Sequence, residues 1–342
     1  MVALGTEDSP PELCGDLADT RHAGQPARGR CIPMSAIVGY VGLDGRLTVR
    51  EEISRMAEAL SHRGPDGRAT WNEGIAGLGH CMLHTTPESL RERLPLARGN
   101  LVITADARID NREELFSSLR LVRTKPELIT DSELILSAYR AWGEDCAQRL
   151  LGDFAFAIWD SSKRQLFCAR DHFGVKPLYY YHQSRQRFVF ASEIKGILCL
   201  PDIPEQINDA KIADYILETF ENNSDTFYAH VNRLPPGSMM VISEDGVRQS
   251  TYWSLGPERE IRMKSDAEYA EAFRSIFFDA VNCRLRSAFP LGTMLSGGLD
   301  SSSIACVAHE LAGNRAGGNL HTFSVVFNQV KNSDERQFIE KI

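Results

Sequence analysis

The sequence lacks any long apolar run, since no stretch approaches the ~20 consecutive apolar residues that a membrane-spanning helix requires. Its first twenty residues carry acidic side chains where a secretory signal would carry basic residues followed by a long apolar segment. We therefore expect no membrane partner, and the cytoplasm is the expected location.

A cysteine framework is also lacking. The eight cysteines are scattered, with no Cys-X-X-Cys pair and no His/Cys spacing typical of a metal site, so reduced structural thiols are expected. The formal net charge of -8 argues against a protein that binds phosphate backbones, and no nucleic-acid partner is expected. A small anionic ligand at one local site remains compatible with this charge.

With 342 residues, of which 43% are hydrophobic and 25% charged, the chain is long enough for two domains. Residues 1–33 are rich in Gly, Pro, Ala, Arg and Asp without hydrophobic periodicity, which predicts a flexible extension. A mixed domain is expected over residues 34–200. Two prolines in CLPDIPEQ mark its boundary, so that residues 201–264 form a linker with connecting strands and residues 265–342 begin a second domain.

Hydrophobic periodicity predicts the elements of both domains. Strands are expected in the first domain at residues 35–43, 100–109, 152–160, 166–171 and 187–193, and helices at 49–60 and 131–143. The second domain is expected to start with a long helix at 266–286, followed by a strand (290–296), a Gly/Ser turn, a helix (302–313) and a strand (320–327). This order is typical of a βαβ unit.

The turn between that strand and helix reads SGGLDSS, from Ser296 to Ser302. Glycines after a strand let the backbone approach a ligand closely, and the N-terminus of a helix attracts phosphate. The lysine of a Walker motif is missing, and Asp300 stands in the loop instead, which suits a Mg²⁺ ion carried by phosphates. The pattern favours a phosphate site over an ordinary serine-capped turn.

Together with five other stretches, SGGLDSS resembles the asparagine synthetase family over Ser35 to Ile342. The other stretches, in order, are HRGPDG (62–67), DARIDN (106–111), ARDHFGVKPLYY (169–180), FASEIKGIL (190–198) and RLPPG (233–237). The resemblance implies an α+β N-terminal-nucleophile domain, an αββα sandwich, followed by the start of an α/β pyrophosphate-loop ATPase domain.

In this family the first domain hydrolyses glutamine to release ammonia, and the second activates a carboxylate with ATP and Mg²⁺ before an amine displaces AMP. The resemblance places Leu295 and Val325 at the adenine, and Asp300 near the metal. The pyrophosphate would be held by Ser296, Gly297, Gly298, Leu299, Asp300 and Ser301.

Three positions depart from the glutamine-hydrolysing pattern. Ser35 stands where the family has its nucleophilic cysteine, and its weaker hydroxyl could be activated by its own α-amine only after cleavage behind Met34. With 33 residues upstream, that amine is a peptide nitrogen. Met82 replaces the arginine that clasps the glutamine carboxylate. Asp106 replaces the asparagine that donates to the oxyanion, and a carboxylate would repel this charge. We predict an inactive glutaminase.

Two remnants of the glutamine pocket match the family pattern. Arg63 lies in the RGPD turn, and Asp131 matches the aspartate that binds the glutamine amino group. A structural interpretation is also open, in which the HRGPDG turn holds only backbone and Arg170 and Asp171 form a structural ion pair. A degraded glutaminase domain would then serve as a scaffold for its neighbour.

Three functions stay open. One is a glutamine-independent ligase similar to lasso-peptide macrolactam cyclases, which the segment 79–96 resembles, with a small-molecule or precursor-peptide carboxylate as partner. The second is a genuine asparagine synthase that makes asparagine from aspartate, and the third is a non-catalytic scaffold. A homodimer is compatible with each of them.

The last residues, NSDERQFIEKI, resemble the start of the next family helix, so we expect a chain truncated inside the synthetase domain. Only two strands of a parallel sheet are predicted there, against the ~5–6 strands of a typical sheet. Because parallel strands need cover on both faces, we expect this part to be poorly stable alone.

Overall fold

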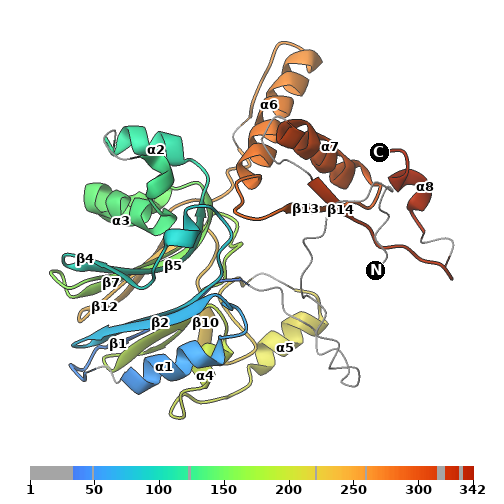
Figure 1. Ribbon diagram of the computed structural model, residues 1–342. Helices are drawn as coiled ribbons and strands as arrows, with labels where there is room; N and C mark the ends of the chain where they lie inside the picture. The colour runs from blue at the N-terminus through green and yellow to red at the C-terminus, as the bar shows by residue number, and fades with distance from the viewer. Residues whose placement is uncertain are drawn as a thin grey trace, which may run out of the picture. The chain divides into compact units, whose positions relative to one another are not determined.

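The computed structural model gives the fold of most of the chain (Figure 1). The predicted extension over residues 1–33 lies outside the described residues, as do Cys14 and Cys31. The structure describes residues 34–47, 50–121, 125–219, 222–258, 260–313, 320–330 and 334–342. These residues divide into two compact units, one ending at Arg259 and one beginning at Glu260.

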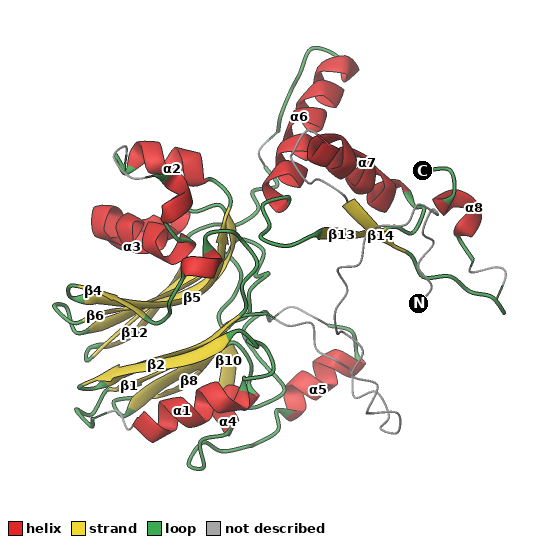
Figure 2. Ribbon diagram, in the orientation of Figure 1, coloured by secondary structure: helices red, strands yellow, loops and turns green. Residues whose placement is uncertain are grey.

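The larger unit contains two six-stranded antiparallel sheets that face each other (Figure 2). The first sheet has the order β10-β8-β9-β1-β3-β2, with bounds β1 (Ala36–Gly42), β2 (Gly67–Glu73), β3 (Ala76–Met82), β8 (Tyr179–Gln183), β9 (Arg187–Ala191) and β10 (Val231–Arg233). The second has the order β12-β11-β7-β6-β5-β4, with bounds β4 (Leu96–Arg98), β5 (Leu101–Ile109), β6 (Gly152–Asp160), β7 (Gln165–Arg170), β11 (Ser238–Ser243) and β12 (Gly246–Thr251).

Helices cover the outer face of each sheet. The first sheet carries α1 (Arg50–Ala59) and α4 (Lys195–Leu198), and the second carries α2 (Arg112–Ser118) and α3 (Asp131–Trp142) (Figure 2). A further helix, α5 (Asp209–Ile216), and three 3₁₀ helices (Ser89–Arg91, Pro126–Leu128, Gly143–Arg149) complete the unit. The arrangement is the predicted αββα sandwich, which confirms the expected α+β fold class.

Alternation along the strands builds the layers of this sandwich. In β1, Ile37 and Val41 pack in the core between the sheets, whereas Val38 and Tyr40 pack with α1. Helix α3 has a capping box at Thr130, which fixes its first turn beside β5. These local patterns account for the agreement between the predicted and observed strands and helices of residues 35–193.

The expected domain boundary near residue 200 is too early. Strand β10 pairs with β8 in the first sheet, and β11 pairs with β7 in the second. Residues 201–258 therefore complete both sheets of the sandwich. The prolines of CLPDIPEQ lie in a connection inside the unit, because Pro201 and Pro204 follow α4 and precede α5.

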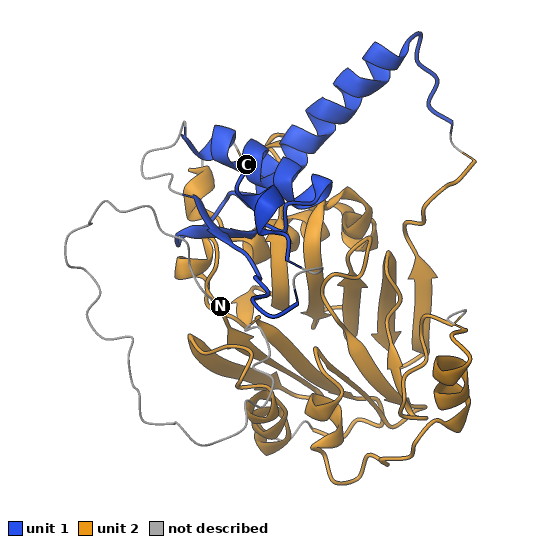
Figure 3. Ribbon diagram, turned by 90° about the vertical axis from the view of Figure 1, so that its right-hand side faces the viewer, with its two compact units in different colours: residues 1–30, 260–342 blue, residues 31–259 orange. Residues whose placement is uncertain are grey.

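The smaller unit is the predicted βαβ unit preceded by a long helix (Figure 3). Its elements are α6 (Asp266–Arg284), β13 (Leu291–Met294), α7 (Leu299–Gly313), β14 (Leu320–Phe323) and α8 (Arg336–Ile339). Strands β13 and β14 pair in parallel, with Leu291 opposite Leu320. The apolar stripe of α6 is only partly covered, since Val281 is buried but Phe273 and Ile276 are exposed.

The six cysteines among the described residues are free thiols, as predicted. Among the helices that the structure describes, none combines the length and apolar character needed to cross a membrane.

Candidate functional site

Ser35 lies directly before β1, at one end of the first sheet. Its hydroxyl oxygen accepts from the Leu83 N–H at 3.0 Å and lies 3.4 Å from the Leu83 carbonyl, to which it donates. The residue is 9% exposed. Strand pairing explains the contact, because Ala36 is opposite Cys81 and Ser35 is therefore level with the end of β3. The hydroxyl is thus engaged with backbone on both its donor and its acceptor side.

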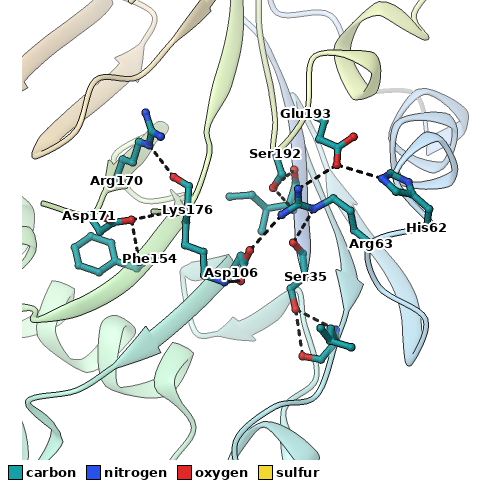
Figure 4. Close-up of polar contacts among 12 residues, drawn as sticks. Ser35, His62, Arg63, Asp106, Phe154, Arg170, Asp171, Lys176, Ser192 and Glu193 are labelled. Carbon is teal, nitrogen blue, oxygen red and sulfur yellow. Dashed lines mark hydrogen bonds and ion pairs between the residues drawn. The ribbon is translucent and has the colours of Figure 1, made fainter. Parts of the chain in front are cut away.

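Arg63 connects the HRGPDG turn to Ser35 (Figure 4). Its Nε donates to the Ser35 carbonyl at 3.1 Å, and its Nη1 donates to Glu193 Oε1 at 3.0 Å. The turn is held closely against β3, because a Cβ on Gly64 would lie 2.2 Å from the Cys81 carbonyl carbon. The structure therefore gives Arg63 a clear backbone-holding role at the Ser35 position.

The carboxylate of Glu193 lies within hydrogen-bond distance of three nitrogen-bearing side chains. His62 Nε2, Arg63 Nη1 and Lys195 Nζ lie 3.0 to 3.1 Å from its carboxylate oxygens. Burial alone would raise the pKa of Glu193, but the hydrogen bonds from these side chains outweigh it and lower the pKa below its ordinary value. Glu193 is therefore a carboxylate that fixes Arg63, as Figure 4 shows.

Asp106 lies on the other side of Arg63, on β5. Its Oδ1 is 2.7 Å from Lys176 Nζ, and its Oδ2 is 3.7 Å from Arg63 Nη2 (Figure 4). Asp106 and Arg63 are both buried. The carboxylate is thus paired with two cations, and it presents acceptors where the family has an amide donor. Sequence analysis gave Lys176 no role, although its place inside the ARDHFGVKPLYY stretch was a signal for a cation near the site.

Arg170 and Asp171 build the loop that carries Lys176. Arg170 donates to three backbone carbonyls, those of Gly174, Lys176 and Leu234, at 2.6 to 2.7 Å. Asp171 accepts from the backbone N–H groups of Phe154, Phe173, Val175 and Lys176. The expected ion pair between Arg170 and Asp171 is wrong, because both side chains are used on backbone groups. Their effect is to fix the backbone that presents Lys176 to Asp106.

Asp131 lies in a second cluster, at the first residue of α3. Its carboxylate is bonded to the Arg112 guanidinium and accepts from the Ile109 N–H at 3.2 Å. Arg112 Nε is also 3.8 Å from Glu88 Oε1. The structure therefore brings Arg63 and Asp106 together and gives Asp131 a separate ion pair. Its expected contact with a glutamine amino group stays a prediction.

The SGGLDSS loop joins β13 to α7 in the smaller unit. Ser296 Oγ is 2.9 Å from Ser301 Oγ, which also accepts from the Ser296 N–H at 3.2 Å, and the Gly298 N–H donates weakly to Ser296 Oγ at 3.4 Å. Gly297 has a φ of 79°, and a Cβ on it would lie 2.6 Å from the Phe338 Cβ. Glycine is required here by conformation and by space.

The residues of the Gly/Ser loop fit a phosphate group bound at the N-terminus of the helix that follows the loop. The hydroxyls of Ser296 and Ser301 are hydrogen-bonded to each other, and Asp300 is exposed in the first turn of α7. No cluster of three or more metal-ligating side chains occurs within the described ranges. The expected position of Asp300 near a Mg²⁺ ion stays a prediction.

The expected adenine residues are neighbours of this loop. Leu295 is buried, its N–H donates to the Phe323 carbonyl at 2.8 Å, and its own carbonyl accepts from Ser324 Oγ at 2.7 Å. Val325 follows Ser324 and is exposed. The end of β13 and the residues after β14 are therefore hydrogen-bonded to each other beside the Gly/Ser loop. The adenine contact of Leu295 and Val325 stays a prediction.

Two protein families match this chain, one in each of its two parts. The glutamine amidotransferase domain family matches residues 34–253, which is well over half of the chain. The chain belongs to this family. The asparagine synthase family matches residues 272–342 of the same chain, and the two matches in this order confirm the resemblance to asparagine synthetases.

Curated relatives carry the same names. The chain is 34% identical over 220 residues to "Asparagine synthetase [glutamine-hydrolyzing] 3" of Bacillus subtilis, covering 64% of this chain and 35% of the relative. It is 35% identical over 236 residues to "Putative asparagine synthetase [glutamine-hydrolyzing] 2" of Methanocaldococcus jannaschii, covering 68% of this chain and 44% of the relative. The chain thus spans between a third and a half of the length of these relatives.

Among solved structures, a glutamine phosphoribosylpyrophosphate amidotransferase from B. subtilis, complexed with ADP and GMP, aligns with a TM-score of 0.46 and 15% identity. The alignment covers 86% of this chain and 67% of that structure.

Proposed function

We propose that the chain is part of an ATP-dependent ligase that joins a carboxylate to an amine without hydrolysing glutamine. The carboxylate would be adenylated, and the amine would then displace AMP, with pyrophosphate released earlier. The observation that carries the glutamine-independent part is the ion pair of Asp106 with Lys176 and Arg63 beside Ser35. A position that needs a donor for a developing oxyanion holds a carboxylate instead.

The state of Ser35 supports the same proposal. Its hydroxyl is bonded to Leu83, and unless the chain is cleaved after Met34 its nitrogen belongs to a peptide bond, so no free amine activates the hydroxyl in the uncleaved chain. The position of the carboxylate-binding arginine is occupied by Met82, whose side chain is buried. Each of these three features opposes a different requirement of glutamine hydrolysis, namely nucleophile, oxyanion donor and substrate clasp.

The Gly/Ser loop supports the nucleotide part of the proposal. Ser296, Ser301 and the backbone around Gly297 would hold the pyrophosphate, Asp300 would hold the Mg²⁺ ion, and Leu295 with Val325 would contact the adenine. ATP supplies the leaving group that makes the carboxylate reactive. The contribution of the chain is to orient the phosphates at the N-terminus of α7, where the helix dipole favours negative charge.

The acceptor amine then has to come from a source other than glutamine. A peptide whose own N-terminal amine attacks its adenylated Asp or Glu side chain, as in lasso-peptide cyclases, would meet this requirement. Holding both groups on one molecule gives the amine a high effective concentration. A precursor peptide is therefore the proposed substrate class, and a small-molecule carboxylate is its simplest variant.

A genuine asparagine synthase is the second candidate. It is favoured by the names of the relatives, which are glutamine-hydrolysing asparagine synthetases, and by the intact contact between Arg63 and the Ser35 carbonyl. In this case aspartate would be the carboxylate and glutamine the ammonia source. A non-catalytic scaffold is the third candidate, and it is favoured by the backbone-holding roles of Arg63, Arg170 and Asp171.

One experiment separates the three candidates. The chain is incubated with ATP, Mg²⁺ and labelled pyrophosphate, alone, with aspartate, or with an acidic peptide, and the exchange of label into ATP is measured. The proposal predicts exchange that depends on a carboxylate and falls about tenfold in Ser301→Ala, but stays unchanged in the control Ser303→Ala. Absence of exchange under every condition favours the scaffold, and exchange with aspartate accompanied by glutamate release from glutamine favours the asparagine synthase.

A further inference from the structure

Helix α5 (Asp209–Ile216) contributes nothing to the buried cores of the chain. None of its residues is buried, and none belongs to the hydrophobic clusters found among the described residues. A helix of two turns is marginal in water, and helices in proteins owe most of their stability to the packing of one apolar face. In α5 such a face exists and is open to solvent.

Four apolar side chains form an exposed patch on α5 and on the segment beside it. Ile212, Tyr215 and Ile216 have the i, i+3, i+4 spacing that places side chains on one side of a helix. The Tyr215 ring meets the Phe227 ring edge-on, with the ring centroids 5.7 Å apart. Tyr215 is 62% and Ile216 73% exposed, and Ile212 and Phe227 are exposed as well. These four residues are called the α5 patch below.

Hydrogen bonds connect the α5 patch to the first sheet. Asn208 caps α5, its Nδ2 donates to the Thr226 carbonyl at 3.1 Å, and its N–H donates to the Phe227 carbonyl at 2.9 Å. Thr226 is buried, and its hydroxyl donates to the carbonyl of Val231, in β10, at 2.6 Å. The patch is therefore a preformed surface, which lowers the entropic cost of binding a partner.

The charges next to the α5 patch are mainly negative. Asp209 and Glu218 are exposed, and each lies three residues from a residue of the patch. Neither carboxylate lies at ion-pair distance from a cation in the described part of the chain. The cation of the helix, Lys211, is turned away from solvent: its side chain is 12% exposed, and its Nζ donates to the Asn222 carbonyl at 3.2 Å and lies 3.9 Å from Asp214 Oδ2. An apolar centre with charged residues at its rim is typical of a protein–protein interface.

We propose that the α5 patch binds a basic amphipathic helix of another protein. The apolar side of that helix would pack on Tyr215 and Ile216, and its lysine or arginine side chains would reach Asp209 and Glu218. A second copy of this chain is disfavoured, because a symmetric contact would bring the same unpaired carboxylates together. The carboxylates also oppose an anionic membrane surface, which attracts basic segments.

A fluorescently labelled synthetic peptide, LKKLLKLLKKLLKL, is the probe for this binding. In a helix its leucines form one face and its lysines the other. The 342-residue chain is added to a trace of the peptide, and the fluorescence anisotropy is followed. We expect a Kd below about 50 μM. The acidic counterpart LEELLELLEELLEL, and a scrambled peptide with the composition of the basic one, should bind at least about tenfold more weakly.

Variants of the chain separate the apolar and the charged contributions. Ile216→Asp should weaken binding about tenfold or more, although the added negative charge alone would attract the peptide. Asp209→Asn combined with Glu218→Gln should weaken binding about threefold at low salt and less at high salt. Matched changes of exposed residues outside the α5 patch should leave binding unchanged; these are Leu128→Asp, and Glu113→Gln combined with Glu127→Gln.

Three results would overturn the proposed interface. The first is no binding of the basic peptide up to about 500 μM of the chain, or binding that Ile216→Asp leaves unchanged. The second is a dimer of the parent chain, seen by sedimentation velocity, that dissociates in Ile216→Asp, because a second copy would then cover the α5 patch. The third is binding of the parent chain to phosphatidylserine vesicles that is lost in Ile216→Asp, because the patch would then contact lipid. None of these results depends on the Ser35 region or on the Gly/Ser loop.

Discussion

The two candidate sites of this chain are in opposite states. Around Ser35, the polar side chains are buried or half-buried and form ion pairs, with Asp106 Oδ1 held by Lys176 and with Glu193 holding Arg63, and only Arg63 Nη2 and Asp106 Oδ2 of these groups lack a hydrogen bond to the described residues. In the Gly/Ser loop, Ser296 and Asp300 are exposed, and Ser296 Oγ lies 2.9 Å from Ser301 Oγ in the same loop. Polar groups that satisfy one another make structure, whereas exposed groups gathered at a helix N-terminus can take a ligand.

The two units that carry these sites also differ, in the extent of their buried hydrophobic cores. The larger unit has three extensive buried clusters, whereas the core of the smaller unit is the cluster of Val281, Leu285 and Ala308. Phe273 in α6 is 69% exposed. The difference teaches that the first unit can persist as a rigid scaffold whatever its catalytic state, while the second depends more on what covers it.

The largest contrast is expected from the cores. Phe156→Ala should destabilise the larger unit by about 3–5 kcal/mol, because a fully buried ring is lost and a cavity remains. Phe273→Ala should change the free energy of unfolding by less than about 1 kcal/mol, since that ring is exposed. Urea unfolding followed by circular dichroism measures both. Equal losses in the two variants would remove the contrast between the units.

The next effect is expected from the buried ion pair. Asp106→Ala removes the carboxylate bonded to Lys176 and leaves Arg63 with Glu193 alone, and it should cost about 3 kcal/mol. The matched control is Glu244→Ala, which breaks an exposed pair with Arg164 and should cost about 0–1 kcal/mol. The same unfolding assay applies. A cost for Asp106→Ala as small as that of the control would mean that the pair does not stabilise the Ser35 region.

A smaller, pH-dependent effect is expected at Glu92. Burial, with some help from the charge of Asp131, raises its pKa from 4.5 to about 7 in the folded chain. The folded state therefore holds this proton more tightly, and the resulting stability is present below about pH 4.5 and is lost as the pH rises through 7. Glu92→Gln keeps the group neutral, so it should gain about 2–3 kcal/mol relative to the parent between about pH 5 and 8.

Unfolding free energies of both proteins across this pH range check the prediction for Glu92. The exposed Glu244→Gln should show no comparable gain. A flat difference between Glu92→Gln and the parent would show that Glu92 is ionised and solvated in the folded chain.

The smallest effect is expected in the Gly/Ser loop. Gly297→Ala forces a side chain into a left-handed conformation and against Phe338, which should cost about 1–2 kcal/mol in the conformation of the loop. The affinity for a fluorescent ATP analogue should fall by up to about tenfold as a result. Gly313→Ala, at the end of α7 with open space around it, should leave the affinity unchanged. Equal affinities in both variants would separate the loop from nucleotide binding.

Local patterns were sufficient for much of the fold. The alternation in β1 and the stripe of Ile53, Met56 and Ala57 in α1 are decided by neighbours in sequence, and the structure has both elements where they are expected. The extension of the sandwich beyond residue 200 depends on pairing of β10 and β11 with distant strands. A local sequence pattern does not specify which strands pair with each other. The domain boundary predicted near residue 200 is therefore too early.

The candidate site shows the same limit. The substitutions at Ser35, Met82 and Asp106 could be recognised from the sequence, but the charge environment of Asp106 could not. Repulsion of an oxyanion was expected, yet the structure supplies Lys176 and Arg63 as counter-ions. The adjacent charges of Arg170 and Asp171 were also misleading, because Arg170 binds backbone carbonyls and Asp171 binds backbone N–H groups. Which charges meet is set by loop conformation, which residue type alone does not specify.

The most direct test of the central claim is glutamate release from labelled glutamine by the 342-residue chain and by Ser35→Ala. The claim is that the Ser35 region is a paired, structural remnant while the Gly/Ser loop serves the nucleotide. It predicts no release above background from either protein, with or without ATP and Mg²⁺. Release by the parent chain that disappears in Ser35→Ala would contradict it.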